Sequence, residues 1–166
     1  MTENFYAEQS EERLKQLEKG AFVTTSDGEK VNTMTIGWGS IGYVWRKPVF
    51  TILVRHSRFT HELLEKNSEF TVSIPSHDMK TALSICGSKS GRDCDKFTEA
   101  NLTPQPGKKV SVPVIAECDH HYECKIIYKQ DMDPGALNAA DNKSNYPQGD
   151  YHTIYYGEII ASYDKE

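Results

Sequence analysis

The sequence has no long hydrophobic run. Its longest apolar stretch, residues 49–54, is interrupted by Thr51 and is far shorter than the ~20 residues that a membrane-spanning helix requires. The chain begins Met-Thr-Glu-Asn, without the basic and then apolar segments of a secretion signal. We therefore expect no membrane partner and a cytoplasmic location.

The four cysteines lack the spacing of common metal or redox motifs. Cys86, Cys94, Cys118 and Cys124 form no CxxC pair, and reduced thiols are expected in a chain without a secretion signal. Cys118, His120 and Cys124 could contribute to a zinc site. However, six residues of extended strand span roughly 20 Å, so both thiols could reach one ion only across a sharp bend. We expect a strand with mixed faces here, and no metal site.

Motifs for several enzyme classes are also missing. The sequence contains no GxxxxGK[ST] loop, no GxGxxG fingerprint, no Ser–His–Asp set and no paired carboxylates. Hydrolase and Rossmann-type interpretations therefore have no support. His152 could serve a ligand as a donor or proton carrier, although a strand histidine satisfied by its neighbours is the more common case.

Basic residues are fewer than acidic ones, and the net charge is −5. This balance argues against a nucleic-acid partner. The distribution is uneven, because residues 46–97 hold nine Lys or Arg against six Asp or Glu. The rest of the chain holds ten against eighteen. The small basic excess coincides with two polar clusters described below.

The pattern of apolar residues predicts one mainly β domain, residues 1–166, built as a barrel with short helical insertions. The expected strands are residues 21–25, 31–37, 49–54, 69–74, 112–115, 117–128 and 151–163. The expected helices are residues 8–19, 60–67, 77–86 and 93–100, with a long polar loop at 131–150. Ser10 is expected to cap the first helix, with Leu14 and Leu17 on one of its faces.

The most informative stretch is residues 32–42, Asn-Thr-Met-Thr-Ile-Gly-Trp-Gly-Ser-Ile-Gly. We expect it at the end of a strand and in the loop that follows. Glycine lets the backbone approach a flat ligand closely, while Met34 and Trp38 offer soft and aromatic surface. This segment is a candidate for binding a planar ring.

Two downstream clusters have the chemistry of an anion site. Residues 55–60 follow a strand and enter a helix, and their guanidinium and hydroxyl groups suit a phosphate. A solvated turn with Ser57 as a helix cap is the alternative. Residues 88–92, Ser-Lys-Ser-Gly-Arg, could wrap a phosphate or a ring edge, or could form a plain surface loop. A ring site beside a phosphate site outlines a flavin nucleotide.

Four motifs together resemble the flavin reductase-like family, in particular its flavoredoxin-type branch. They are residues 32–40 followed by Trp45 and Pro48, residues 54–60, residues 88–97 and residues 152–159. They run in the family's order from about residue 20 to residue 163. Each motif is weak alone, but four in order are specific.

The resemblance implies a Greek-key split β-barrel that binds FMN non-covalently, usually as a homodimer with the flavin near the subunit interface. Carried over, the ring contacts would come from Asn32, Thr33, Met34, Thr35, Trp38, Gly39 and Ser40. The phosphate would be held by Arg55, Ser57, Arg58 and Thr60. The cofactor would be covered by Ser88, Lys89, Ser90, Gly91, Arg92 and Lys96.

The expected function is an FMN-dependent oxidoreductase that passes electrons from NAD(P)H to a flavin or a redox protein. The cofactor carries this chemistry, so no catalytic acid or base is expected. The alternatives are a non-catalytic FMN-binding electron carrier reduced only by a protein partner, and a ligand-binding barrel without flavin.

Overall fold

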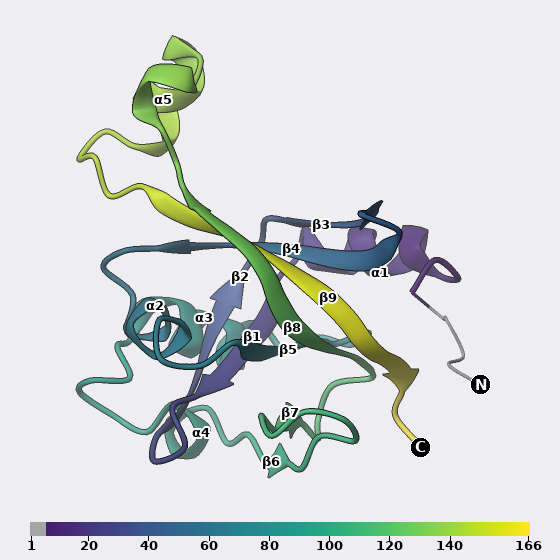
Figure 1. Ribbon diagram of the computed structural model, residues 1–166. Helices are drawn as coiled ribbons and strands as arrows, with labels where there is room; N and C mark the ends of the chain where they lie inside the picture. The colour runs from purple at the N-terminus through teal and green to yellow at the C-terminus, as the bar shows by residue number, and fades with distance from the viewer. Residues whose placement is uncertain (1–5) are drawn as a thin grey trace.

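The computed structural model describes residues 6–166. Its body is an antiparallel seven-stranded sheet in the order β2-β1-β5-β8-β9-β4-β3 (Figure 1). These strands are β1 (Ala21–Ser26), β2 (Val31–Ile36), β3 (Gly39–Val44), β4 (Lys47–Arg55), β5 (Glu69–Ile74), β8 (His120–Asp131) and β9 (His152–Asp164). A separate two-stranded sheet pairs β6 (Pro104–Gln105) with β7 (Val114–Ile115).

Short helices connect or cover the strands. They are α1 (Ser10–Leu17), α2 (Phe59–Leu64), α3 (Lys80–Ser88), α4 (Lys96–Glu99), the 3-10 helix η1 (Pro134–Ala136) and α5 (Ala139–Asn145). The expected mainly β architecture with helical insertions is confirmed.

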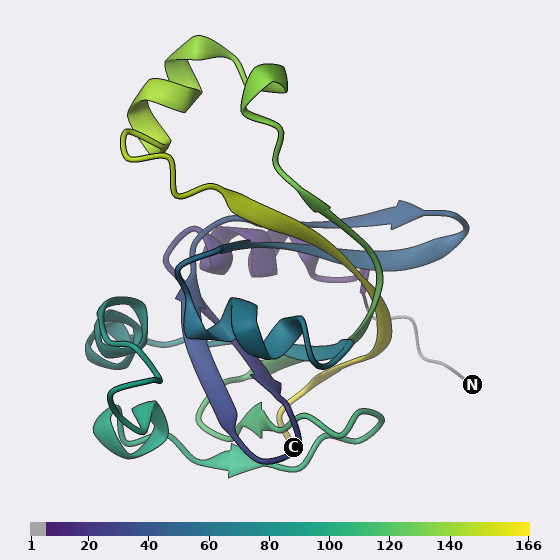
Figure 2. The same ribbon diagram turned by 60° about the vertical axis from the view of Figure 1, so that its left-hand side comes forward.

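The sheet curls on itself, as the turned view shows (Figure 2). Side chains from its strands form one main apolar core. Phe50, Phe70, Tyr122 and Tyr155 are fully buried in it, and the rings of Phe50 and Tyr122 meet edge to face with centroids 5.0 Å apart. Burial of such large apolar rings is the main force that closes the sheet. The edge strands of the seven-stranded sheet are β2 and β3.

β3 corrects one expectation, because Gly39 and Ser40 begin a strand instead of lying in a loop. β3 pairs with β4 from Gly39↔Ile52 to Val44↔Lys47. The connecting residues Trp45 and Arg46 both have positive φ, 52° and 62°, as a two-residue type I′ turn requires. Neither residue is one of the usual turn formers, so the sequence carried no signal for this hairpin.

α1 also differs from expectation. Ser10 is its first helical residue, and Gln9 precedes it without any side-chain cap. The buried residues are Leu17 and Arg13, whereas Leu14 is exposed. Arg13 is buried because it ties α1 to the end of β9, with its guanidinium 2.7 Å from the Asp164 carboxylate.

The segment after β8 is more structured than the expected loop. Residues 132–151, here called the arm, contain η1 and α5, and the arm projects away from the sheet in both views (Figures 1 and 2). Asn138 caps α5 by accepting a hydrogen bond from the backbone N–H of Asp141.

The cysteine-rich segment is part of the core. β8 begins at His120, so Cys118 lies in the turn before the strand and packs in a second, smaller apolar cluster. Cys124 lies in the main core, and all four cysteines are free thiols. His121 is buried against the Ser73 hydroxyl, 3.1 Å from its Nδ1. These contacts assign the segment a packing role.

Candidate functional site

The end of β4, the start of α2 and the α3–α4 connection converge on a pocket of about 280 Å³, here called the basic pocket. Its lining is rich in cations and hydroxyls: Met34, Arg55, Ser57, Arg58, Phe59, Thr60, Ser88, Lys89, Ser90, Lys96 and Asp150. The two polar clusters identified in the sequence therefore face one cavity.

Three of the four cations that line the basic pocket, Arg55, Arg58 and Lys96, form no ion pair within residues 6–166. Arg58 and Lys96 each donate to a backbone carbonyl, Arg58 to Gly87 at 2.8 Å and Lys96 to Cys86 at 2.8 Å. Burial lowers the pKa of Lys96 to about 8, and it also lowers the pKa of Arg58. The lining holds four cations against one carboxylate, that of Asp150, so an anion bound in the pocket would lower the cost of burying this charge.

The arm closes one side of the basic pocket. Arg55 donates from its guanidinium to the carbonyls of Asp150 (2.6 Å) and Asn145 (3.0 Å), and it lies over the Tyr146 ring. The Asp150 carboxylate accepts from the Ser57 hydroxyl at 2.5 Å. Arg55 thus holds the arm in place as well as lining the cavity.

A second pocket of about 170 Å³ adjoins the first and is here called the Trp38 pocket. It is lined by Met34, Thr35, Ile36, Gly37, Trp38, Leu53, Arg55, Arg58 and His152. Three of these, Met34, Arg55 and Arg58, also line the basic pocket. The two pockets are therefore contiguous, with one end bordered by Trp38 and the other rich in cations.

His152 is the polar side chain opposite Trp38, with ring centroids 5.4 Å apart. Its Nδ1 lies 2.6 Å from the Tyr146 hydroxyl. Burial, followed by the nearby Arg55 charge, lowers the pKa of His152 to about 4. The ring is therefore neutral at pH 7 and can offer a hydrogen bond without a charge.

Most of the site residues predicted from the sequence line these two pockets. They are Met34, Thr35, Trp38, Arg55, Ser57, Arg58, Thr60, Ser88, Lys89, Ser90 and Lys96. Their role in binding stays a prediction.

The remaining predicted residues lie behind or beside the pockets. Asn32 donates to the Thr60 hydroxyl at 2.9 Å, and the Thr33 hydroxyl bonds to the carbonyl of Val23. Gly39 packs against β4. Ser40 is exposed on β3, and Gly91 and Arg92 lie in the α3–α4 connection.

Asp150 was not predicted as a site residue, and His152 was expected to be a strand histidine satisfied by its neighbours. Both come to the site through strand pairing, since the register of β4 with β9 sets Arg55 opposite His152. Arg55 and Asp150 are 95 residues apart in the sequence, so no local pattern indicates that they are neighbours in the fold.

Comparison with protein families decides the affiliation. Residues 18–166 match the model of the flavin reductase like domain. The chain belongs to the flavin reductase-like family. A family relative from Archaeoglobus fulgidus is 29% identical over 139 residues, which cover 84% of this chain and 68% of the relative. The expected family is thereby confirmed.

Solved structures of the family share the fold. Flavoredoxin of Desulfovibrio vulgaris (Miyazaki F) matches with a TM-score of 0.70 at 26% identity, over 89% of this chain and 69% of its own. The NADH:FAD oxidoreductase SgcE6 of Streptomyces globisporus matches with a TM-score of 0.67 at 22% identity, over 87% and 73%. The expected split barrel is confirmed. Among the described residues, no helix has both the length and the apolar character needed to cross a membrane.

Proposed function

We propose that this protein is an FMN-dependent oxidoreductase that takes electrons from NAD(P)H and passes them to a flavin or a redox protein. The observation that carries the proposal is the contiguity of the two pockets, one rich in cations and one bordered by Trp38, through Met34, Arg55 and Arg58. This arrangement fits a nucleotide with a planar ring system and a terminal phosphate. The family membership supports FMN as that nucleotide, as does the likeness to an FMN-binding protein from Thermus thermophilus, with a TM-score of 0.68 at 23% identity.

The basic pocket would hold the phosphate. Arg58 and Lys96 supply cations without ion-pair partners in the described chain, and Thr60 and Ser88 add hydroxyls at the wall. Charge-assisted hydrogen bonds from such groups are the strong contacts to phosphate oxygens. The chemistry of this donor set fits a phosphate monoester dianion.

The Trp38 pocket would hold the ring. β2 is an edge strand of the sheet, so backbone groups on its outer side are not used in strand pairing and can bond to a ring edge. Trp38 and Met34 give apolar contact, while neutral His152 gives a polar contact without adding charge. FMN, when bound, supplies hydride acceptance and the stepwise release of electrons. The protein's part is to bind and orient the ring and to leave access for the donor.

A second candidate is an electron carrier that accepts electrons only from a protein partner. The observation that favours it is the likeness to flavoredoxin, at 26% identity and a TM-score of 0.70. Both candidates use the same FMN site and differ only in the donor.

Two measurements test these proposals in order. The purified protein should be yellow or should take up added FMN; a colourless protein that does not bind FMN would remove both candidates. Anaerobic addition of NADH or NADPH should then bleach the visible flavin band. If neither nucleotide bleaches an FMN-loaded sample, the carrier becomes the better description.

We further propose that the protein acts as a homodimer. Three aromatic side chains form a surface cluster, here called the aromatic patch: Trp45 at the β3–β4 turn, Tyr128 on β8 and Tyr156 on β9. Their ring centroids lie 5.4–6.0 Å apart, and Trp45 is 59% exposed. Exposed aromatic clusters of this kind mark association surfaces.

A further inference from the structure

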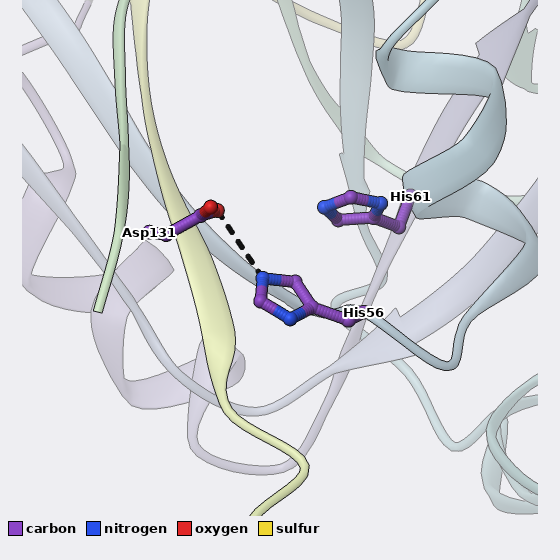
Figure 3. A group of neighbouring side chains, drawn as sticks. All are labelled: His56, His61 and Asp131. Atoms are coloured by element: carbon purple, nitrogen blue, oxygen red, sulfur yellow. Dashed lines mark hydrogen bonds and ion pairs between the residues drawn. The ribbon is translucent and has the colours of Figure 1, made fainter. Parts of the chain in front are cut away.

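A second polar cluster lies outside the proposed FMN site, around His56, His61 and Asp131. One ligating atom from each of these side chains lies within 4.8 Å of those of the other two. Figure 3 shows both imidazole rings and the carboxylate directed toward a common space. The cluster faces a pocket of about 410 Å³, here called the histidine pocket, which shares no lining residue with the basic pocket or the Trp38 pocket.

The topology of the sheet builds this cluster from three separate segments. Asp131 ends β8 and pairs with Thr153 of β9, and Thr153 also pairs with Val54 of β4. Directly after β4, the turn into α2 carries His56, and α2 itself carries His61. The positions of the ligating groups are therefore fixed by paired strands and one short helix.

The Thr153 hydroxyl lies at the centre of the cluster. Its oxygen is 3.0 Å from His56 Nε2, 2.9 Å from His61 Nε2 and 2.6 Å from the Asp131 carboxylate. A hydroxyl has one proton to donate, and it goes to the carboxylate, so both imidazoles donate to the oxygen. Thr153 thus brings both Nε2 atoms and the carboxylate close to one point. A metal ion there would bind the tautomer of each imidazole that carries its proton on Nδ1, so that the free Nε2 replaces its hydrogen bond to Thr153 with a bond to the metal.

We propose that His56, His61 and Asp131 bind a divalent transition-metal ion, with Zn²⁺ as the first candidate. Two imidazoles and one carboxylate are a ligand set that zinc and its neighbours in the first transition row accept, whereas Mg²⁺ and Ca²⁺ prefer oxygen ligands alone. The site would use three protein ligands and keep a coordination position open toward the histidine pocket.

The distances require only a small adjustment to form the site. Ligand atoms at about 2.0–2.2 Å from zinc lie roughly 3.3 Å from one another in a tetrahedral site. His56 Nε2 and Asp131 Oδ1 are already 3.2 Å apart. The other separations, at most 4.8 Å, must close by no more than about 1.5 Å. The side chains of His56 and Asp131 are 46% and 71% exposed, so their rotation can provide this movement.

The charge at the site also favours a cation. The histidine pocket contains the carboxylates of Asp131 and Glu65 and one ammonium, Lys129, which is paired with Glu65 at 2.7 Å. The Asp131 carboxylate therefore has no lysine or arginine ion-pair partner within residues 6–166. A bound dication would balance this charge.

The test is zinc titration of the tag-free, FMN-loaded full chain by calorimetry, with no nicotinamide present. We expect one Zn²⁺ per chain, and no competition from a hundredfold excess of Mg²⁺. His61→Gln, His56→Gln and Asp131→Asn should each weaken zinc binding by at least about tenfold, since even loss of a group that only orients a ligand costs about 10–100-fold.

The matched control is His77→Gln. His77 Nδ1 lies 3.1 Å from the Asp119 carboxylate, an exposed His–carboxylate pair without a second imidazole. This variant should bind zinc as the wild type does, and so should Cys94→Ser, which removes a partly exposed thiol. Absence of stoichiometric binding, or loss of binding in either control with retention in the cluster variants, would overturn the proposal.

Folding of the variants is checked by their FMN retention and near-UV circular dichroism. Should the cluster variants fail to fold, the wild type still decides the question through its histidine ring NMR signals. Shifts of two of the rings that saturate at one equivalent of Zn²⁺ support the site, and unchanged spectra overturn it. The readout is zinc binding, so a negative result for the metal site would not depend on whether the protein reduces flavin.

Discussion

The Lys96 ammonium lies 2.8 Å from the carbonyl oxygen of Cys86 and is 3% exposed, at the wall of the basic pocket. This hydrogen bond ties the start of α4 to α3 and holds the cation at a fixed position. No carboxylate within residues 6–166 forms an ion pair with it. A buried ammonium held by one neutral acceptor is suited to receive an anion.

The first prediction concerns the pH dependence of FMN binding. Burial lowers the pKa of Lys96 to about 8, so the side chain is protonated below that pH and neutral above it. In the proposed site, the phosphate would bind the protonated form. FMN affinity should therefore be nearly constant between about pH 7 and pH 8, since the phosphate itself takes up a proton only near pH 6, and it should fall above pH 8 by up to about tenfold per pH unit. Fluorescence titration of the apoprotein with FMN over this range measures the effect.

Lys96→Met is the matched control for this titration. It removes the charge and keeps a similar apolar stem, so FMN binding at neutral pH should weaken by about tenfold or more. The decline above pH 8 should also disappear in this variant. An unchanged decline would assign the titration to another group.

The second prediction separates two arginines that line both pockets. Arg58→Ala removes a cation that is anchored only to the Gly87 carbonyl, and should weaken FMN binding by roughly 1.5–3 kcal/mol without disturbing the arm. Arg55→Ala should weaken FMN binding in the same range and should also release the arm, since Arg55 holds the carbonyls of Asn145 and Asp150.

Limited proteolysis distinguishes these outcomes. Cleavage within residues 132–151 should be faster in Arg55→Ala than in the wild type and unchanged in Arg58→Ala. Unchanged FMN affinity in both variants would mean that the phosphate lies elsewhere. Equal cleavage in all three proteins would show that Arg55 does not hold the arm.

The fold and the candidate site could be predicted only in part from the sequence. Local patterns predict the strand around Phe50 from a nearly continuous apolar run and the strand around Phe70 from alternating apolar and polar residues. The cationic cluster was visible because its members are neighbours along the chain. His152 and Asp150 reach the site only through the pairing of β4 with β9, which no local pattern encodes. The same holds for the His56–Asp131 cluster, whose members are 75 residues apart.

Edge elements were the least predictable part of the fold. β3 is rich in glycine and exposed side chains, so it has neither the alternation nor the burial of an ordinary strand. Its pairing with β4 depends on a turn at Trp45 and Arg46, whose positive φ is unusual for such residues. α5 is short and has no buried residue, so no apolar face marks it in the sequence.

The third prediction concerns Gly157, where β9 crosses the core. A Cβ here would lie 2.6 Å from Cε1 of Phe70 and 2.8 Å from Cβ of Cys124, both parts of the rigid interior. Gly157→Ala should therefore lower the free energy of unfolding by about 1–3 kcal/mol, as overpacking of a core does. Gly42→Ala is the control, because a Cβ there meets nothing within 4 Å and the change should leave stability nearly unaltered. Urea unfolding of both variants measures the difference.

The last prediction tests the proposed dimer through the aromatic patch. Trp45 is 59% exposed at the tip of the β3–β4 hairpin, with Tyr128 and Tyr156 beside it. Trp45→Glu places a charge in this patch, and burying an unpaired carboxylate in an interface is strongly unfavourable. Light scattering coupled to gel filtration should show a dimer for the wild type and a monomer for this variant. Val31→Glu, at another exposed apolar position (41%) on β2, should remain dimeric. A monomeric wild type would refute the dimer, and a dimeric Trp45→Glu would place its interface away from this hairpin.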